Sequence, residues 1–243
     1  MTNYNAASKT YDNTRDSDDV IIEMMEKRNV FGKDKNILDY GCGTGNYLRK
    51  ISRRYEGNFY GLEPSEGMRE KARAKNPGLT IIEGNEKHIP YDDNFFDFIY
   101  MTDVIHHVPD RDALFLSLFQ KTRSGGRLCV MTQSWAQIGA RWYNRFFPSL
   151  EANQKTRYPD IPEIQRRAVV AGFHCLETGI KPQPDTRIVD AHFIKMVEEK
   201  NYSMFRDLGE DEFARGLKNL KEHAGMEIPS KNAGESLVWF QKL

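Results

Sequence analysis

The chain has 243 residues, with 35 basic and 35 acidic side chains and a formal net charge of zero. This length can bury one sizeable core, and the neutral balance lacks the electrostatic signature of a nonspecific nucleic-acid or membrane-surface binder. No stretch approaches the about 20 apolar residues of a membrane span, and the three cysteines have neither metal-site nor disulfide spacing. We expect a single cytoplasmic domain, 1–243, with no metal, membrane span or nucleic-acid partner; the oligomeric state stays open.

An irregular start precedes a predicted helix over about Asp18–Arg28, and the most informative segment, Asp39–Gly45, follows with the sequence DYGCGTG. This segment comes after the apolar pair Ile37–Leu38 and before a predicted helix over Asn46–Tyr55. It therefore has the pattern of a strand, a glycine-rich turn and a helix, which is typical of folds that bind adenine-containing cofactors. Glycines let the backbone approach a ligand closely, and the helix start offers unpaired N–H groups. The acid before the turn, Asp39, can accept hydrogen bonds beside the same pocket.

The glycine spacing distinguishes between cofactors. A dinucleotide fingerprint has the pattern G-x-G-x-x-G, whose third glycine packs the helix onto the strand. Here the third glycine comes one residue early, at Gly45, and Asn46 occupies the position that the dinucleotide pattern needs. A nicotinamide-dependent dehydrogenase is therefore the less favoured alternative.

A second predicted strand ends at Glu63, where an acid can accept hydrogen bonds from both hydroxyls of a ribose. Capping of the following helix is the alternative role for this acid. Later strands and helices alternate along the chain. In order, the predicted elements are a helix over Ser65–Lys75, strands over Leu79–Glu83 and Phe96–Met101, a helix, a turn at Ser124–Gly126, a strand over Arg127–Thr132, a helix over Ile161–Ala171, and strands over Phe173–Ile180 and Glu235–Lys242.

Over residues 35–135 the chain resembles the class I S-adenosylmethionine-dependent methyltransferases, in the branch that includes the ubiquinone and menaquinone methyltransferases. The resemblance is carried by D-x-G-x-G-x-G at 39–45, by the acid at Glu63, and by the segments 83–97 and 102–110. It implies an α/β, Rossmann-like, doubly wound fold. The sheet is expected to be seven-stranded and mainly parallel, with helices on both faces and an antiparallel last strand. The implied cofactor is S-adenosyl-L-methionine, and the implied product is S-adenosyl-L-homocysteine.

The resemblance also implies which residues contact the cofactor. Asn85 stands where the family has an acid that reads the adenine amino group, and its side-chain oxygen can still accept a hydrogen bond. Residues 1–30 are expected to cover the cofactor, with Tyr11 facing the sulfonium and Arg15 pairing with the carboxylate; a surface turn is the alternative. The expected cofactor contacts are Tyr11, Arg15, Asp39, Gly41, Gly43, Glu63, Pro64, Met68, Asn85, Glu86 and Thr102.

Two stretches, 135–158 and 185–225, interrupt the alternation of strands and helices, and the second is expected to be largely helical. Both follow strand ends, where open α/β sheets bind their ligands. We expect them to form a lid over the acceptor; the alternative is that their aromatic residues only pack onto the sheet. The expected acceptor contacts are Trp135, Arg141, Trp142 and Tyr143.

Methyl transfer from a sulfonium is an in-line displacement, so the protein mainly has to align the reactants and exclude water. A general base is needed only for an acceptor that carries a proton. His107 and His106 are the candidates, Asp103 is a weaker one, and a structural role in the turn is the alternative.

The sequence therefore predicts an S-adenosylmethionine-dependent methyltransferase that acts on a small molecule in cofactor or natural-product biosynthesis. It leaves open whether nitrogen, oxygen or carbon is methylated. A non-catalytic binding module and an NAD-dependent dehydrogenase are the alternatives. A nucleic-acid amino-methyltransferase is disfavoured, because residues 102–105 lack its Asn/Asp-Pro-Pro-aromatic motif.

Overall fold

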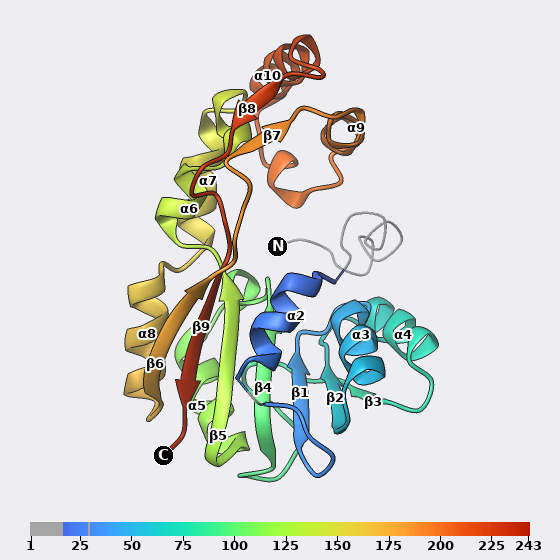
Figure 1. Cartoon of the computed structure of the whole chain (residues 1–243), viewed down its shortest axis with the longest axis vertical. Coiled ribbons are helices and arrows are strands. Elements are labelled where there is room, and N and C mark those ends of the chain that lie inside the picture. Colours follow the sequence, from blue (N-terminus) through green and yellow to red (C-terminus); the bar gives the residue numbers. More distant parts are fainter. Residues whose placement is uncertain (1–16, 29) are drawn as a thin grey trace.

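A computed structural model describes residues 17–28 and 30–243. Its main sheet has seven strands in the order β3-β2-β1-β4-β5-β9-β6 (Figure 1). Strands β1 to β5 pair in parallel, and β9 is antiparallel to both of its neighbours. The predicted fold class is confirmed, including the antiparallel last strand. The strands are β1 Asn36–Tyr40, β2 Asn58–Leu62, β3 Thr80–Ile82, β4 Phe96–Thr102, β5 Thr122–Thr132, β6 His174–Ile180 and β9 Ser236–Gln241.

Helices cover both faces of this sheet, so the inner strands β1, β4, β5 and β9 are mostly buried on both sides, whereas the edge strand β6 is largely exposed. Along β4, Phe98 and Tyr100 face the core that contains α2, α3 and α4, whereas Ile99 and Met101 face the core that contains α5 and α8. The helices predicted over 18–28, 46–55, 65–75 and 161–171 are confirmed within two residues at each end, and α5 is the helix that was predicted without bounds. Their bounds are α2 Asp19–Glu26, α3 Asn46–Arg54, α4 Glu66–Lys75, α5 Arg111–Lys121 and α8 Ile161–Val170.

Strand β5 begins earlier than predicted. The expected free turn at Ser124–Gly126 is wrong, because the ladder pairs Phe96 with Thr122 and Phe98 with Arg127, which leaves 123–126 as a bulge inside the strand. Backbone hydrogen bonds with Lys242 keep this bulge in the sheet. Glycines in a strand mark bulges as well as turns, and the sequence pattern does not separate the two.

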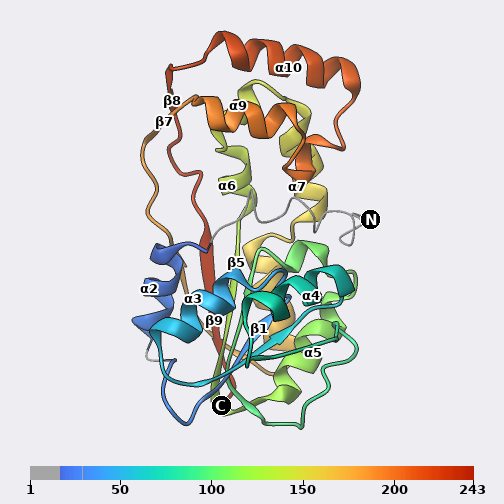
Figure 2. The same ribbon diagram turned by 90° about the vertical axis from the view of Figure 1, so that its right-hand side faces the viewer.

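The two insertions extend beyond the carboxyl ends of the parallel strands (Figures 1 and 2). The first contains α6 Trp135–Gly139, the 3₁₀ turn η2 Trp142–Arg145 and α7 Ser149–Arg157. The second contains β7 Thr186–Ile188, α9 Ala191–Glu198, η3 Ser203–Phe205, α10 Glu210–Glu222 and β8 Glu227–Pro229. Its largely helical character is confirmed, and the short antiparallel β7–β8 ribbon was not predicted.

The insertions share an apolar cluster of their own. Phe146, Phe147 and Leu150 of the first pack with buried side chains between 189 and 228 of the second. The two ends of the second insertion lie side by side beyond the sheet, because Lys181 N donates to Glu235 O at 2.8 Å and Ser230 N donates to Asp185 O at 2.7 Å. The excursion thus continues to Ser230, beyond the predicted limit of 225. Within the described part of the chain, no helix is long and apolar enough to cross a membrane.

Candidate functional site: a cofactor turn and the cavity above it

The glycine turn lies between the end of β1 and the start of α3, and two of its glycines are required by close contacts. Gly41 has φ +72°, and a Cβ there would lie 2.7 Å from Val104 after β4. Gly45 has φ +78°, and a Cβ there would lie 2.5 Å from Asn76 at the end of α4. The first glycine therefore lets β1 and β4 meet beneath the turn, and the third lets α3 approach α4.

Glu63, at the end of β2, supports this turn from below. Its Oε2 accepts a hydrogen bond from Gly43 N at 3.0 Å, and its Oε1 accepts one from Ser65 N at 2.9 Å. Burial raises the pKa of Glu63, while these two N–H groups and Arg69 act to lower it. A carboxylate can accept about four hydrogen bonds, so two acceptor positions remain for the hydroxyls of a ribose. Its place at the strand end suits that role.

Asp39 lies deeper than expected. Its side chain is 1 % exposed and is not among the described residues that line the cavity above the turn. Burial raises the pKa of Asp39 to about 8, with a further contribution from Glu63, while Tyr100 and the Leu48 backbone act to lower it. The structure therefore places Asp39 under the turn, and its contact with a cofactor stays a prediction.

The buried carboxyl makes the stability of the protein depend on pH. A raised pKa means that the folded state favours protonated Asp39. Its contribution to stability is complete below about pH 4, the unfolded value, and is lost as the pH rises towards 8. We expect the free energy of unfolding to fall by up to about 1.4 kcal/mol per pH unit from this group between these limits. Urea unfolding at several pH values should show a shallower decline in Asp39→Asn, and equal slopes would contradict the assignment.

At the expected adenine end, the side chain of Asn85 is already engaged. Its Oδ1 accepts hydrogen bonds from Lys87 N at 2.9 Å and from His88 N at 3.1 Å, and a carbonyl oxygen has two lone pairs. A hydrogen bond from the adenine amino group to this oxygen would therefore have to displace one of the two turn hydrogen bonds. Nearby, Met68 is buried and Pro64 is exposed, and the adenine contacts, including that of Glu86, stay predictions.

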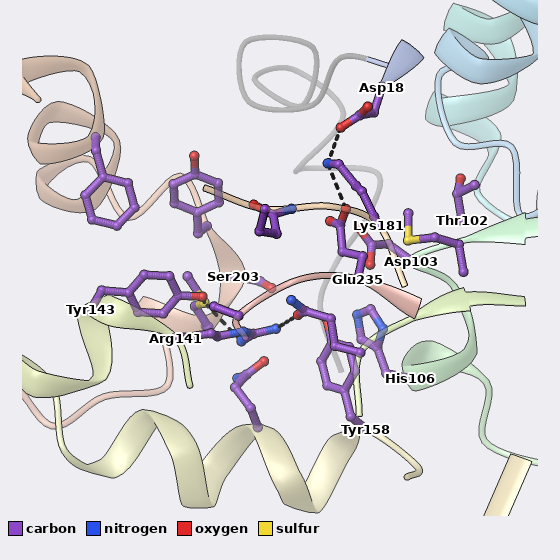
Figure 3. A pocket seen from close by; sticks show the side chains of 18 of the residues that line it. Asp18, Thr102, Asp103, His106, Arg141, Tyr143, Tyr158, Lys181, Ser203 and Glu235 are labelled. Atoms are coloured by element: carbon purple, nitrogen blue, oxygen red, sulfur yellow. Dashed lines mark hydrogen bonds and ion pairs between the residues drawn. The ribbon is translucent and has the colours of Figure 1, made fainter. Parts of the chain in front are cut away.

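A cavity of about 520 Å³ opens between the glycine turn and the insertions (Figure 3). It brings together some of the expected cofactor contacts, some of the expected acceptor contacts and one of the two candidate histidines. Of the predicted site residues, those that line it are Gly41, Gly43, Thr102, the weaker base candidate Asp103, His106, Arg141, Trp142 and Tyr143. His107, Trp135 and the residues of the expected adenosine end are not among the described lining. Tyr11 and Arg15 lie outside the described residues.

Several lining residues were missed by the sequence analysis. Lys181, just after β6, forms ion pairs with Asp18 before α2 and with Glu235 before β9, the latter at 3.0 Å (Figure 3). Burial raises the pKa of Glu235, and Asp103 adds to the shift, while Lys181 acts to lower it. These side chains come from distant parts of the sequence, and no local spacing connects them.

Aromatic rings line the side of the cavity formed by the first insertion. The His106 ring stacks on Tyr158 at 3.9 Å between centroids, with 13° between the planes. The Arg141 guanidinium lies 5.6 Å from the Tyr158 ring centre and 5.9 Å from that of Tyr143. Trp135 instead stands behind this wall, where its Nε1 donates to Tyr158 O at 2.8 Å. A direct contact of Trp135 with an acceptor stays a prediction that its position does not favour.

Comparison with known proteins agrees with this geometry. A model of the methyltransferase domain matches residues 38–130. The demethylmenaquinone methyltransferase of Geobacillus kaustophilus is 30 % identical over 160 residues, which cover 59 % of this chain and 68 % of that protein. Phosphoethanolamine N-methyltransferase 1 of Arabidopsis thaliana is 32 % identical over 114 residues, which cover 44 % of this chain and 23 % of that protein. The two relatives carry names with different acceptors.

Solved structures agree on the fold. The geranyl diphosphate C-methyltransferase of Streptomyces coelicolor superposes with a TM-score of 0.60 at 14 % identity, covering 91 % of this chain and 76 % of that one. The cyclase SpnF also has a TM-score of 0.60, at 17 % identity, covering 91 % of this chain and 80 % of that one. The fold therefore does not by itself specify the reaction, and the sequence match carries the assignment. The chain belongs to the class I S-adenosylmethionine-dependent methyltransferases, enzymes that use S-adenosyl-L-methionine as methyl donor and release S-adenosyl-L-homocysteine.

Proposed function

We propose that this enzyme methylates a small molecule held in the cavity between the glycine turn and the two insertions. The observation that carries the proposal is the continuity of this cavity. Its lining runs from Gly41 and Gly43 to Tyr158 and Arg141 of the first insertion. A volume of about 520 Å³ lies within the usual range for small-molecule sites.

The residues present suit the cofactor. Glu63 has acceptor capacity for a ribose, and the glycine turn leaves room for close approach of a ligand. Asp18, Asp103 and Glu235 place carboxyl groups in the cavity wall beside a single lysine, Lys181 (Figure 3). The carboxyl groups outnumber the lysine beside them, so this part of the wall favours a ligand with cationic groups, whereas Arg141 lies in the part formed by the first insertion. When bound, S-adenosyl-L-methionine supplies a methyl group on a positively charged sulfur.

The protein's own residues then have to orient the acceptor and exclude water. The two insertions act as the lid in this proposal, because they line the cavity with aromatic side chains and are held together by their shared apolar cluster. His106 is 8 % exposed and lines the cavity, so we assign it the role of taking a proton from a phenol, enol or amine acceptor. The ring centroids of His106 and His107 are 3.8 Å apart, and we assign His107 a supporting role.

The names of the relatives favour a place in cofactor or natural-product biosynthesis, which we adopt as part of the proposal. The neutral charge of the chain supports a small-molecule acceptor over nucleic acid, and we expect a cytoplasmic enzyme. A non-catalytic module that binds the cofactor remains the second candidate, because the glycine turn would be the same in both.

One experiment separates these functions. We expect micromolar or tighter binding of S-adenosyl-L-homocysteine in calorimetry, and no binding of NAD as a control. Incubation with S-adenosyl-L-methionine and a panel of phenols, amines, quinols and carboxylic acids should release S-adenosyl-L-homocysteine with at least one of them. A base role of His106 would appear as lost turnover at neutral pH in His106→Asn. Binding without turnover across a broad panel would favour the non-catalytic module.

A further inference from the structure

Arg141 is a buried cation in the cavity wall. The residue is 9 % exposed and lies between the short helix α6 and the 3₁₀ turn η2. Its Nη2 donates to Gln133 Oε1, and its Nη1 lies 3.9 Å from the sulfur of Met204. Tyr143 and Tyr158 flank the guanidinium (Figure 3). All of these neighbours are neutral groups.

No carboxylate among the described residues lies within ion-pair distance of this guanidinium, and Asp103 acts on it only through space. Burial acts to lower the pKa of Arg141, but the two tyrosines and Asp103 outweigh it and raise the pKa, so the side chain stays charged. Burying a charge without a partner of opposite sign is costly, and a bound anionic ligand would supply that partner.

A second donor lies in the same wall. Gln154 on α7 is 4 % exposed and lines the cavity, and its side chain makes no hydrogen bond within 17–28 and 30–243. Arg141 and Gln154 thus offer several N–H donors to a ligand in one cavity, and donors of this kind bind planar or tetrahedral oxyanions.

We infer that the acceptor carries an anionic oxygen group, a carboxylate or a phosphate, which binds Arg141 with Gln154 as a second donor. This inference rests on the proposed function, because it assigns a specificity-determining residue to the same cavity. The rest of the acceptor then lies along the Tyr158 and His106 rings toward Thr102, where β4 ends beside the glycine turn. The charged group is thereby fixed at the far side of the cavity from the cofactor turn.

A purely structural role for Arg141 is the competing explanation. Through Gln133, whose Nε2 donates to Gly234 O at 3.1 Å, the guanidinium also links the first insertion to the segment before β9. A brace of this kind would stabilise the fold without any preference for acidic ligands. The two roles therefore differ in ligand charge and not only in stability.

The test uses protein saturated with S-adenosyl-L-homocysteine and three probes: 4-hydroxybenzoate, phenyl phosphate and the neutral 4-hydroxybenzamide. In calorimetry we expect at least one of the two acids to bind about tenfold or more tightly than the amide. In Arg141→Gln this preference should fall to about onefold, while the affinity for S-adenosyl-L-homocysteine stays within about threefold of wild type. Arg145→Gln is the matched control, because Arg145 is an exposed arginine in the same 3₁₀ turn.

The wild-type measurement alone can overturn the inference, so it does not depend on how well a variant folds. Equal affinity for acids and amide, or no binding of either acid at millimolar concentration, would contradict it. A variant that loses thermal stability but keeps the acid preference would assign Arg141 the bracing role and contradict the inference as well. If the wild type does not bind S-adenosyl-L-homocysteine, the proposed function itself is contradicted.

Discussion

Replacing Glu63 with alanine should weaken the binding of S-adenosyl-L-homocysteine about a hundredfold or more. Hydrogen bonds to charged groups contribute about 1.5–3 kcal/mol each, and the carboxylate has acceptor positions for two ribose hydroxyls. The substitution also removes the acceptor of Gly43 N, so the turn that approaches the ligand loses its support. Calorimetric titration of wild type, Glu63→Gln and Glu63→Ala should give a graded loss, with the amide variant intermediate.

A structural effect of Glu63 on the turn has to be separated from a direct contact with the ribose. Glu70→Ala is a suitable control, because Glu70 is an exposed acid on the neighbouring helix α4. A 2′-deoxy analogue of S-adenosyl-L-homocysteine completes a double-mutant cycle. If Glu63 binds the hydroxyl, the analogue is weaker than the parent compound in wild type and equal to it in Glu63→Ala. If both proteins prefer the parent compound over the analogue to the same degree, Glu63 supports the turn and does not contact this hydroxyl.

The cofactor half of the site could be predicted because its determinants are local. The turn needs glycines at two contacts, Gly41 against Val104 and Gly45 against Asn76, and these leave a visible pattern in the sequence. The inner strands are covered on both faces, so their sequences are continuous apolar runs. The alternation of these runs with helices predicts a parallel sheet. The antiparallel last strand, β9, was predicted from the resemblance to the family, whereas the order of the seven strands was established by the structure.

The acceptor half could not be predicted in the same way. Its wall combines residues such as Asp18, Tyr158, Lys181 and Glu235, which meet only after the sheet and both insertions are in place. The aromatic composition of the first insertion predicted that it contacts the acceptor, but it did not predict the direction in which each ring points. Trp135 therefore looked equivalent to its neighbours, although its indole binds the backbone of Tyr158 from behind. Contacts between elements distant in the sequence decide such details, and one sequence does not record them.

Removing the second insertion should abolish methyl transfer and leave cofactor binding within a few-fold of wild type. Asp185 and Ser230 are joined by a backbone hydrogen bond of 2.7 Å, so a Gly-Gly linker can replace 186–229 without moving the sheet. The deletion removes cavity-lining side chains such as Tyr202 and Met204, whereas the glycine turn and Glu63 lie on the sheet. Release of S-adenosyl-L-homocysteine with an active acceptor from the panel measures the first effect, and calorimetry measures the second.

A point variant tests the same idea without exposing the apolar cluster. Gly216 in α10 faces the first insertion so closely that a Cβ would lie 2.6 Å from Phe146 O and nearer still to the Phe147 ring. Alanine favours a helix more than glycine does, so any loss in Gly216→Ala reports the steric displacement of α10 from the first insertion. Gly209→Ala is the matched control, because nothing lies within 4 Å of its Cβ position. We expect turnover to fall about tenfold or more in Gly216→Ala only, since misplacement by about 1 Å is enough for losses of that size. Wild-type turnover in both the deletion and this variant would show that the second insertion is not a lid and that catalysis does not depend on its packing against the first.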